Sequence, residues 1–591
     1  MKTFFIATGS AILGVVLGTL LLVFAGGLLL SGFAANVSRP APLADSMVLE
    51  LDLRTALPDQ APTSGLNVLL GTPESFIDTI LKIEGAAEDE RVEGIFIRGS
   101  EFGVGSARSE ELRDALKAFQ DADKFVVAHI QGSYGGGPSA YRSIASADEI
   151  WIQPGADLIA TGVGFETMFL RGLFDNLGVT PDIQGFYEYK SAASTYIETD
   201  YTEPHRESLT ALASGLWEAA LSDIAEDRAL SVEFVRTTLE SGPLSAEVMI
   251  ANDLAQETGW PEDARGAALE RAGETAELTY IGSYKAPEPA FGAPTIAVVG
   301  AQGAVVTGSS GGSLLSEGQG FASDTIAGAL LDAGQDESVS AIVFRIDSPG
   351  GSPAASDQIW GAVKRVQDEY NKPVVVSMAS TAASGGYYAA AAAEWIVANR
   401  STITGSIGIV GGKIGISEGL ARIGVNAKSI LIGGEFTGAV STTAPFTPEQ
   451  RQLYGEFLKR GYDRFVEVVA EGRKMSIEDT HERARGRVWS GQDAFENGLV
   501  DQLGGISTAI AKAKELSEIE AETDVRILFY PLAPEGITIG GPSLVSSASD
   551  LQALGKLNDV LSDPAVEAVL TELKAAQSST MQARIPTYNE R

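Results

Sequence analysis

An internal duplication constrains the fold of this 591-residue chain more than any other feature. Apolar runs, helical stretches and charged positions of the N-terminal part return in the same order further along the chain, at a nearly constant separation. Clear pairs of counterparts are Arg98 and Arg345, Lys124 and Lys372, and Trp151 and Trp395. Repetition at one long period indicates that a single structural unit occurs twice. The chain is also too long for one core, so we expect two related halves.

Each half alternates short β-branched runs with amphipathic stretches, for example residues 110–120 and 357–370. This alternation is typical of βα units on a mainly parallel sheet, so the predicted fold class is α/β. Between the halves, residues 284–294 contain three prolines and predict an extended linker. The halves then span residues 45–283 and 295–532, and residues 533–591 form a C-terminal appendage.

A long uncharged segment lies near the N-terminus, between residues 4 and 35. A transmembrane helix needs about 20 apolar residues, whereas a cleavable signal peptide has an apolar core of about 7–15. We therefore predict a transmembrane anchor over residues 1–36, with cleavage near the small residues 32–35 as the alternative. Lys2 precedes the segment and favours a cytoplasmic N-terminus, which would place the rest of the chain outside the cytoplasm.

Composition excludes several classes of protein and site. A formal net charge of −35 argues against nucleic acid as a partner, because phosphate binding needs clustered Lys and Arg. The chain has no cysteine, so disulfides and thiol catalysis are excluded. Its three histidines, His129, His205 and His481, occur in no motif with an acidic partner, so we expect them to be structural or exposed. Neither a metal nor an organic cofactor is predicted.

Two segments, one in each half, carry candidate catalytic residues. Ser384 lies between a buried-strand pattern and the start of an Ala-rich helix, where the helix dipole would stabilise a developing alkoxide. The alternative is that Ser384 only caps this helix. Lys190 lies in the first half and has Gly438 as its counterpart. A serine beside a lysine can cleave amides without histidine, so we expect one site per chain, between the halves.

Lys190 can act as a base only if its amine is neutral. Its pKa must then fall from about 10.4 to near neutrality, mainly through loss of solvation. The alternative is a solvated surface lysine. Glu188 would favour the charged amine if its side chain points the same way.

Five motifs carry a resemblance to a known family. They are Arg345–Gly351 (Arg-Ile-Asp-Ser-Pro-Gly-Gly), Ala383–Tyr387 (Ala-Ser-Gly-Gly-Tyr), Ser401–Gly408 (Ser-Thr-Ile-Thr-Gly-Ser-Ile-Gly), Gly486–Asp493 (Gly-Arg-Val-Trp-Ser-Gly-Gln-Asp) and Tyr189–Ala192 (Tyr-Lys-Ser-Ala). With the duplication and the predicted anchor, the chain resembles the long, duplicated form of bacterial signal peptide peptidase A, also called protease IV.

The resemblance implies two tandem Clp-protease/crotonase-like halves of spiral βαβ units behind the anchor. It also implies Ser384 as nucleophile, Lys190 as general base and Ser406 as the residue that orients the lysine. Gly350 or Gly351, together with Gly385, would form the oxyanion hole through backbone N–H groups.

The expected function is that of a serine endopeptidase anchored in the bacterial inner membrane, with its catalytic part on the periplasmic side. It would degrade signal-peptide remnants and other hydrophobic or unfolded peptides, and it would form a homo-oligomer, for example a tetramer. A crotonase-type acyl thioester enzyme and a non-catalytic membrane scaffold are the alternatives.

Overall fold

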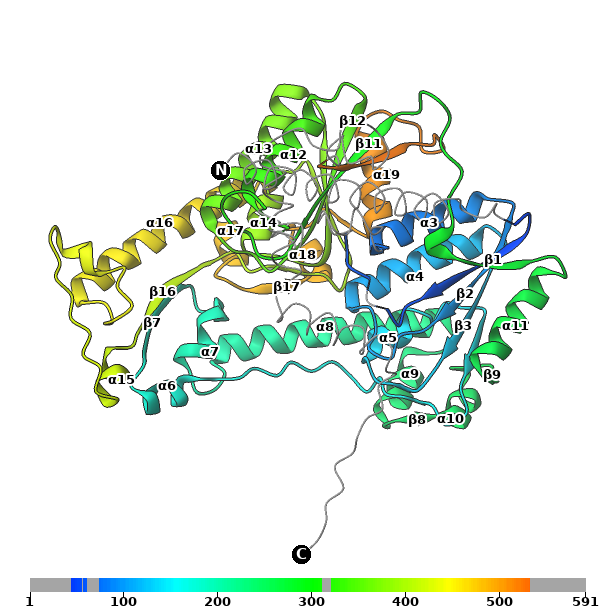
Figure 1. The fold of residues 1–591 in the computed structure, drawn as a ribbon, viewed down its shortest axis with the longest axis horizontal. Helices are drawn as coiled ribbons and strands as arrows, with labels where there is room; N and C mark the ends of the chain where they lie inside the picture. The colour runs from blue at the N-terminus through cyan, green and yellow to red at the C-terminus, as the bar shows by residue number, and fades with distance from the viewer. Residues whose placement is uncertain (1–43, 56, 61–73, 311–319, 532–591) are drawn as a thin grey trace, which may run out of the picture. The chain divides into compact units, whose positions relative to one another are not determined.

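Two mainly parallel β-sheets, one from each predicted half, organise this computed structural model (Figure 1). The structure describes residues 44–55, 57–60, 74–310 and 320–531. The predicted anchor and the predicted C-terminal appendage lie outside the described residues. Within the described ranges, no helix combines the length and the apolar character needed to cross a membrane.

The duplication is visible in the order of the strands. The first sheet consists of β10 (Glu277–Tyr280), β1 (Met47–Asp52), β2 (Val92–Arg98), β3 (Phe125–Ile130), β5 (Glu149–Ile152) and β9 (Glu257–Thr258), in that order. The second sheet repeats this order with β19 (Arg526–Tyr530), β11 (Thr295–Gln302), β12 (Val339–Ser348), β13 (Val374–Ala383), β14 (Trp395–Ala398) and β18 (Gln502–Leu503). Beyond this order, β15 (Ile403–Gly405) pairs with β13, and β17 (Val488–Ser490) pairs with β15 in the antiparallel sense.

The strands are apolar on both faces because helices cover both sides of each sheet. On β12, Ala341 and Val343 belong to a core that also includes the first half, whereas Ile342 and Phe344 belong to a core formed within the second half. The first core therefore joins the two sheets into one compact unit, residues 42–533.

The helices form three groups around the sheets. Between the two sheets lie α3 (Phe76–Glu88), α4 (Ser106–Asp121) and α19 (Ile506–Leu516). The other face of the second sheet is covered by α12 (Ser323–Gln335), α13 (Pro353–Tyr370) and α14 (Gly385–Ala390). The far face of the first sheet is covered by α11 (Pro261–Ala272). The other longer helices are α8 (Glu203–Asp227), α9 (Val232–Glu240) and α16 (Pro448–Arg473); short ones are α5 (Pro138–Arg142), α6 (Arg171–Leu177), α7 (Ser194–Ile197), α10 (Ala246–Ala251), α15 (Ser417–Arg422), α17 (Ile477–Arg483) and α18 (Gly491–Glu496).

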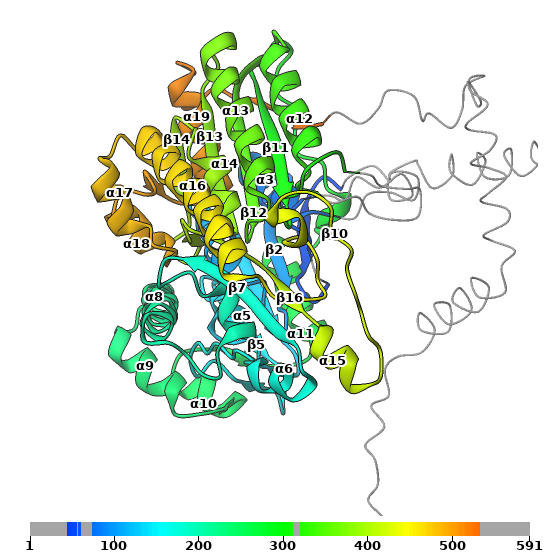
Figure 2. The ribbon, with the colours of Figure 1, turned by 90° about the vertical axis from the view of Figure 1, so that its left-hand side faces the viewer.

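A separate two-stranded ribbon also joins the halves (Figure 2). Its strands are β7 (Thr180–Phe186) of the first half and β16 (Ile409–Gly415) of the second, paired antiparallel over their full length. Phe186 lies opposite Ile409 at one end of the ribbon. The chain just after β7 and the chain just before β16 therefore emerge side by side.

A buried ionic cluster connects the middle layer to the second sheet. Arg345 shares a face of β12 with Ala341 and Val343, so its side chain points toward α4. There it forms ion pairs with Asp59 at 2.8 Å and with Glu111 at 2.9 Å, and the Arg345 and Asp59 side chains are fully buried. The sequence indicated that Arg345 has a counterpart in Arg98, but it did not indicate these partners.

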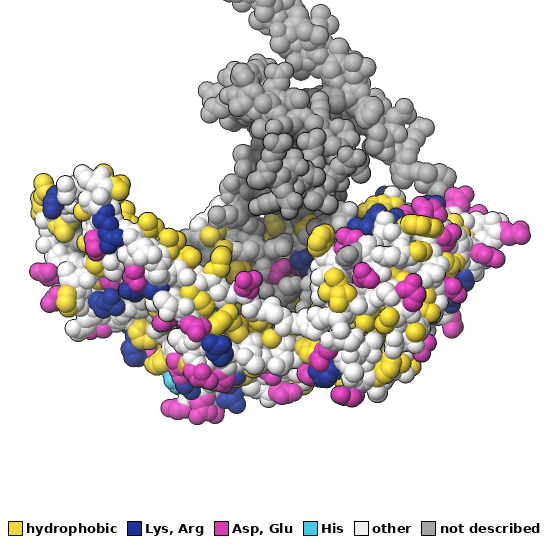
Figure 3. All heavy atoms as spheres, turned by 90° about the horizontal axis from the view of Figure 1, so that it is seen from below, with side chains coloured by type: hydrophobic (Ala, Val, Ile, Leu, Met, Phe, Trp, Pro, Cys, Tyr) yellow, Lys and Arg dark blue, Asp and Glu magenta, His cyan; other side chains and the backbone are white. Residues whose placement is uncertain are grey.

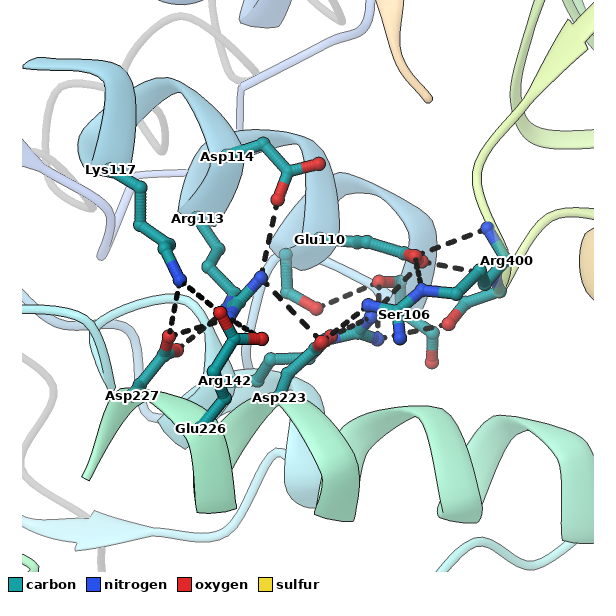
Figure 4. Close-up of polar contacts among 12 residues, drawn as sticks. Ser106, Glu110, Arg113, Asp114, Lys117, Arg142, Asp223, Glu226, Asp227 and Arg400 are labelled. Atoms are coloured by element: carbon teal, nitrogen blue, oxygen red, sulfur yellow. Dashed lines mark hydrogen bonds and ion pairs between the residues drawn. The ribbon is translucent and has the colours of Figure 1, made fainter. Parts of the chain in front are cut away.

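A second cluster lies between α4, α5 and α8 (Figure 4). Arg142 of α5 forms ion pairs with Glu110 of α4 at 3.0 Å and with Asp223 of α8 at 2.5 Å. Glu110 also accepts hydrogen bonds from the backbone N–H groups of Arg400 at 3.1 Å and of Ser401 at 3.0 Å. The segment that enters β15 is thereby tied to the first half.

We expect Arg345→Leu to lower the free energy of unfolding by about 3–5 kcal/mol, because it leaves the buried Glu111 carboxylate without its cation and leaves Asp59 only the longer ion pair with Arg108 at 3.7 Å. The measurement is urea unfolding of the full chain. Arg365→Leu is the control: it removes an exposed ion pair with Glu369 on α13 and should change stability by no more than about 0.5 kcal/mol. Equal effects of the two substitutions would contradict the role given to the buried cluster.

Candidate active site

Ser384 occupies the turn between β13 and α14, as the sequence predicted. Its backbone has φ 52° and ψ −119°, a conformation that non-glycine residues rarely adopt. The Ser384 N–H donates to the Gly405 carbonyl of β15 at 2.8 Å, which holds the turn in place. Ser384 is the N-cap residue of α14, but its side chain makes no capping hydrogen bond, so the interpretation that this serine only caps the helix is wrong. The hydroxyl is therefore available for other contacts.

Lys190, four residues after β7, meets Ser384 from the other half. Its Nζ lies 3.0 Å from Ser384 Oγ, 2.8 Å from the Ser406 carbonyl oxygen and 3.0 Å from Ser406 Oγ. A neutral amine has two N–H groups and one lone pair. Two contacts to Ser406 therefore leave the lone pair free to face the Ser384 hydroxyl.

Burial sets the protonation of this amine. Lys190 is 9% exposed, and loss of solvation lowers its pKa from 10.5 to about 7. The surface-lysine interpretation is therefore wrong. Glu188 points away and forms an ion pair with Arg485, so its carboxylate does not favour the charged amine. An amine that is about half neutral at pH 7, beside a serine hydroxyl, can accept that hydroxyl's proton.

Ser406 follows β15 in a left-handed conformation, with φ 50°. Its N–H donates to the Arg487 carbonyl at 2.7 Å, just before β17. Pairing of β15 with both β13 and β17 thus sets the positions of Ser384 and Ser406 relative to each other.

The candidate oxyanion glycines surround the Ser384 turn. Gly350 packs so closely that an added Cβ would lie 2.6 Å from Ser384 Cβ. Its N–H, however, donates to Ser348 Oγ at 3.1 Å. The Gly351 N–H and the Gly385 N–H have no hydrogen-bond acceptor among the described residues, and a Cβ built on Gly385 would lie 3.0 Å from Gly351 N. These two amides are the neighbouring pair that a developing oxyanion could use.

The histidines lie in other environments. His129 Nε2 is 3.1 Å from the Gly259 carbonyl oxygen, and His481 Nδ1 is 2.7 Å from the Tyr462 hydroxyl. The His205 ring packs against the Tyr201 ring at 5.0 Å. Within the part of the chain that the structure describes, no hydrogen bond joins any of them to a carboxylate. No group of three or more His, Asp or Glu side chains there is arranged to hold a metal ion.

Three residues near the site were missed as functional candidates. The Ser348 hydroxyl accepts a hydrogen bond from the Gly350 N–H, and Gly408 and Gly486 pack against Lys190. All three lie in motifs noted in the sequence. Their partners belong to other segments of the chain, so spacing alone could not reveal what each one contacts.

Comparison with known proteins identifies the family. The sequence model of peptidase family S49 matches residues 118–275 and again residues 367–520. The chain belongs to peptidase family S49. The first match contains Lys190, and the second contains Ser384 and Ser406. The chain is thus a serine peptidase of the long, duplicated type, and the crotonase-type and scaffold alternatives are not favoured.

Two relatives match over most of their length. "Protease 4" of Haemophilus influenzae is 30% identical over 494 residues, which cover 80% of this chain and 77% of that protein. "Serine protease SPPA, chloroplastic" of Arabidopsis thaliana is 29% identical over 495 residues, which cover 81% of this chain and 71% of that protein.

Among solved structures, a ClpP1 mutant from Listeria monocytogenes aligns with a TM-score of 0.22 at 17% identity, over 35% of this chain and 90% of that one. A TM-score this low does not establish a shared fold. The Clp-protease/crotonase-like character therefore remains a prediction, whereas the α/β class and the two family S49 segments are established.

We expect the Lys190 amine to become reactive as pH rises through about 7, because burial disfavours its charged form. The measurement is competitive acetylation followed by mass spectrometry of the Lys190 peptide. Lys459 is the control, because its hydrogen bond to Asp463 raises its pKa and it should react only at alkaline pH. Titration of both amines together at alkaline pH would contradict the desolvation argument.

Proposed function

We propose that the chain cleaves peptides through a dyad in which Ser384 is the nucleophile and Lys190 is the general base. The observation that carries this proposal is the 3.0 Å approach of Lys190 Nζ to Ser384 Oγ, with burial lowering the lysine pKa to about 7. Ser406 orients the amine through its two hydrogen bonds. In this role it keeps the lone pair directed at the nucleophile.

The reaction proceeds through an acyl-enzyme. Ser384 Oγ attacks the scissile carbonyl carbon while its proton passes to Lys190 Nζ. The tetrahedral intermediate collapses, the C–N bond breaks, and Lys190 returns the proton to the departing amine. A water molecule then attacks the ester with Lys190 again accepting a proton, and that proton returns to Ser384 Oγ as the acyl group leaves.

The amides of Gly351 and Gly385 stabilise the oxyanion in this proposal. Gly350 is the poorer candidate because its N–H already donates to Ser348. Its part is to allow the loop to approach the Ser384 turn, where a side chain would overlap Ser384 Cβ.

The proposed substrates are signal-peptide remnants and other hydrophobic or unfolded peptides beside a membrane. The uncharged segment of residues 4–35 supports membrane attachment, and the family supports peptide cleavage. The proposed location of the catalytic part is the periplasmic side of the bacterial inner membrane. Two halves of Clp-protease/crotonase-like character, each of spiral βαβ units, are part of the same proposal.

A homo-oligomer, for example a tetramer, is also proposed. Exposed apolar side chains gather on the segments that flank the β7–β16 ribbon, and hydrophobic surface is visible at that end of the molecule, at the left of Figure 3. The most exposed are Met168, Leu173, Leu177, Ile423, Ile430, Leu431, Ile432 and Val440. Exposed apolar side chains that gather in one region can mark a protein–protein contact.

Ser384→Ala and Lys190→Ala should each abolish peptide cleavage, because each removes one member of the dyad. Lys190→Arg should also be inactive, since arginine keeps its proton in proteins. The assays are hydrolysis of an apolar peptide and labelling of Ser384 by a serine-directed phosphonate. His129→Ala, His205→Ala and His481→Ala serve as controls and should retain activity. A histidine variant that folds normally but is as inactive as Ser384→Ala would refute the dyad.

Deletion of residues 2–36 should release the enzyme from the membrane fraction without abolishing its activity on soluble peptides, because the dyad lies outside that segment. Fractionation and N-terminal sequencing provide the measurements. A mature wild-type chain that begins near Asn36 would favour secretion over anchoring.

A further inference from the structure

The segment Arg485–Trp489 runs between Lys190 and Ser406, and no function has been assigned to it above. It includes Gly486, the first residue of the motif Gly-Arg-Val-Trp-Ser-Gly-Gln-Asp. Its backbone contacts both neighbours. The Tyr189 N–H donates to the Arg485 carbonyl at 3.2 Å, and the Ser406 N–H donates to the Arg487 carbonyl at 2.7 Å. One short segment thus spaces the two residues whose contact positions the lysine amine.

Gly486 lies directly against the Lys190 backbone. Its φ is 83°, and an added Cβ would lie 2.5 Å from both Cβ and N of Lys190 and 2.6 Å from Cα. Backbone atoms cannot turn away as the end of a flexible side chain can. The Gly486 N–H also donates to the Ile407 carbonyl at 2.9 Å, so the glycine cannot retreat without breaking that bond.

Gly408 closes the other side of the lysine side chain. A Cβ at this position would lie 3.1 Å from Lys190 Cδ and 2.8 Å from Gly486 Cα. The aliphatic part of Lys190 therefore lies in a slot formed by two glycines of the second half. Since burial is what lowers the lysine pKa, this slot governs both the position and the protonation of the amine.

Side chains hold the segment from outside. The guanidinium carbons of Arg485 and Arg487 lie 5.5 Å and 5.1 Å from the centre of the Tyr189 ring. Arg487 forms an ion pair with Glu207 at 2.7 Å, and the Tyr189 hydroxyl donates to the same carboxylate group at 2.9 Å. Tyr189, which precedes the lysine, is thus fixed between the two arginines that flank Gly486.

We propose that Gly486 is a positioning residue for catalysis, which sets Lys190 against Ser406 and Ser384 by permitting closest approach of the two backbones. The proposal rests on the proposed function of Lys190 as base. A side chain at position 486 displaces Lys190, which misplaces the amine and opens it to water.

Gly486→Ala should lower kcat/KM by about 100-fold, the size of effect expected for a misplacement of about 1 Å. The loss should fall on kcat more than on KM. The midpoint of the pH–rate profile should also move from about 7 toward the ordinary lysine range, because the displaced amine regains water. A variant that is merely less folded would lose activity without any change in that midpoint.

Gly155→Ala is the matched control. Gly155 has φ 82°, so alanine experiences the same backbone strain as at position 486, but among the described residues nothing lies within 4 Å of the added Cβ. It should keep wild-type kcat/KM and the wild-type pH midpoint. Comparable losses in the two variants would show that strain alone explains the effect, and would overturn the proposal.

Gly408→Ala keeps the proposal falsifiable if Gly486→Ala does not fold. Position 408 has no left-handed φ, and a Cβ there would meet the lysine side chain rather than the lysine backbone, although it would also lie 2.8 Å from Gly486 Cα and from the Phe186 carbonyl oxygen. We expect a smaller loss of kcat with the same direction of pH shift.

Lys190→Ala, assayed in parallel, separates the two proposals. If Lys190→Ala is active, the dyad itself fails; if it is inactive while both glycine variants keep wild-type rates and pH midpoints, only the positioning role fails.

Discussion

Glu110 and Glu111, adjacent on α4, bind the second half of the chain in two places. Glu111 pairs with Arg345 on the central strand β12, and Glu110 accepts hydrogen bonds from Arg400 and Ser401 at the entrance to β15. Removing one member of such a buried cluster leaves an uncompensated charge, so the halves pack together only in an arrangement that keeps every member paired. The site needs this rigidity, because its lysine and its serines belong to different halves. Without a fixed interface, a 3.0 Å approach of Nζ to Oγ would not persist.

The close packing of backbone around Lys190 positions its amine and also lowers its pKa, which allows it to act as a base. Its altered pKa comes from loss of solvation and not from a neighbouring charge. Neighbouring backbone must therefore pack around the lysine side chain and exclude water. Backbone can approach this closely only at glycine, because any other residue would place a Cβ in the gap. Gly408 and Gly486 supply that proximity on the lysine side, as Gly350 does beside Ser384. The turn at Ser384 adds an uncommon backbone conformation, which the Gly405 carbonyl holds in place.

Features governed by local sequence could be predicted. The buried strands and the turn between β13 and α14 follow from periodicity and residue type within short windows, and the duplication follows from the return of such windows at a nearly constant separation. The residue types of Lys190 and Ser384 suggested a pair, but the choice of nucleophile over helix cap for Ser384 rested on motifs that resemble a family. The partners of Arg345 could not be foreseen, since Asp59 lies in a loop distant along the chain and Glu111 belongs to an amphipathic stretch whose sequence does not show which charged residues are buried. The choice between Gly350 and Gly351 depends on one hydrogen bond to Ser348, which spacing does not encode.

The β7–β16 ribbon was also invisible in the sequence, yet it explains why one chain builds one complete site. In an antiparallel pair, the residues after one strand meet the residues before the other. Phe186 pairs with Ile409, so Lys190 beyond β7 and Ser406 ahead of β16 come together at the same end. The register is limited by Gly412, where an added Cβ would lie 2.3 Å from the Asp182 carbonyl oxygen. A slip of one residue would move every side chain to the opposite face and separate Lys190 from Ser406. The ribbon requires one strand from each half, and because the lysine position of the second half is occupied by Gly438, the pairing assembles a single dyad.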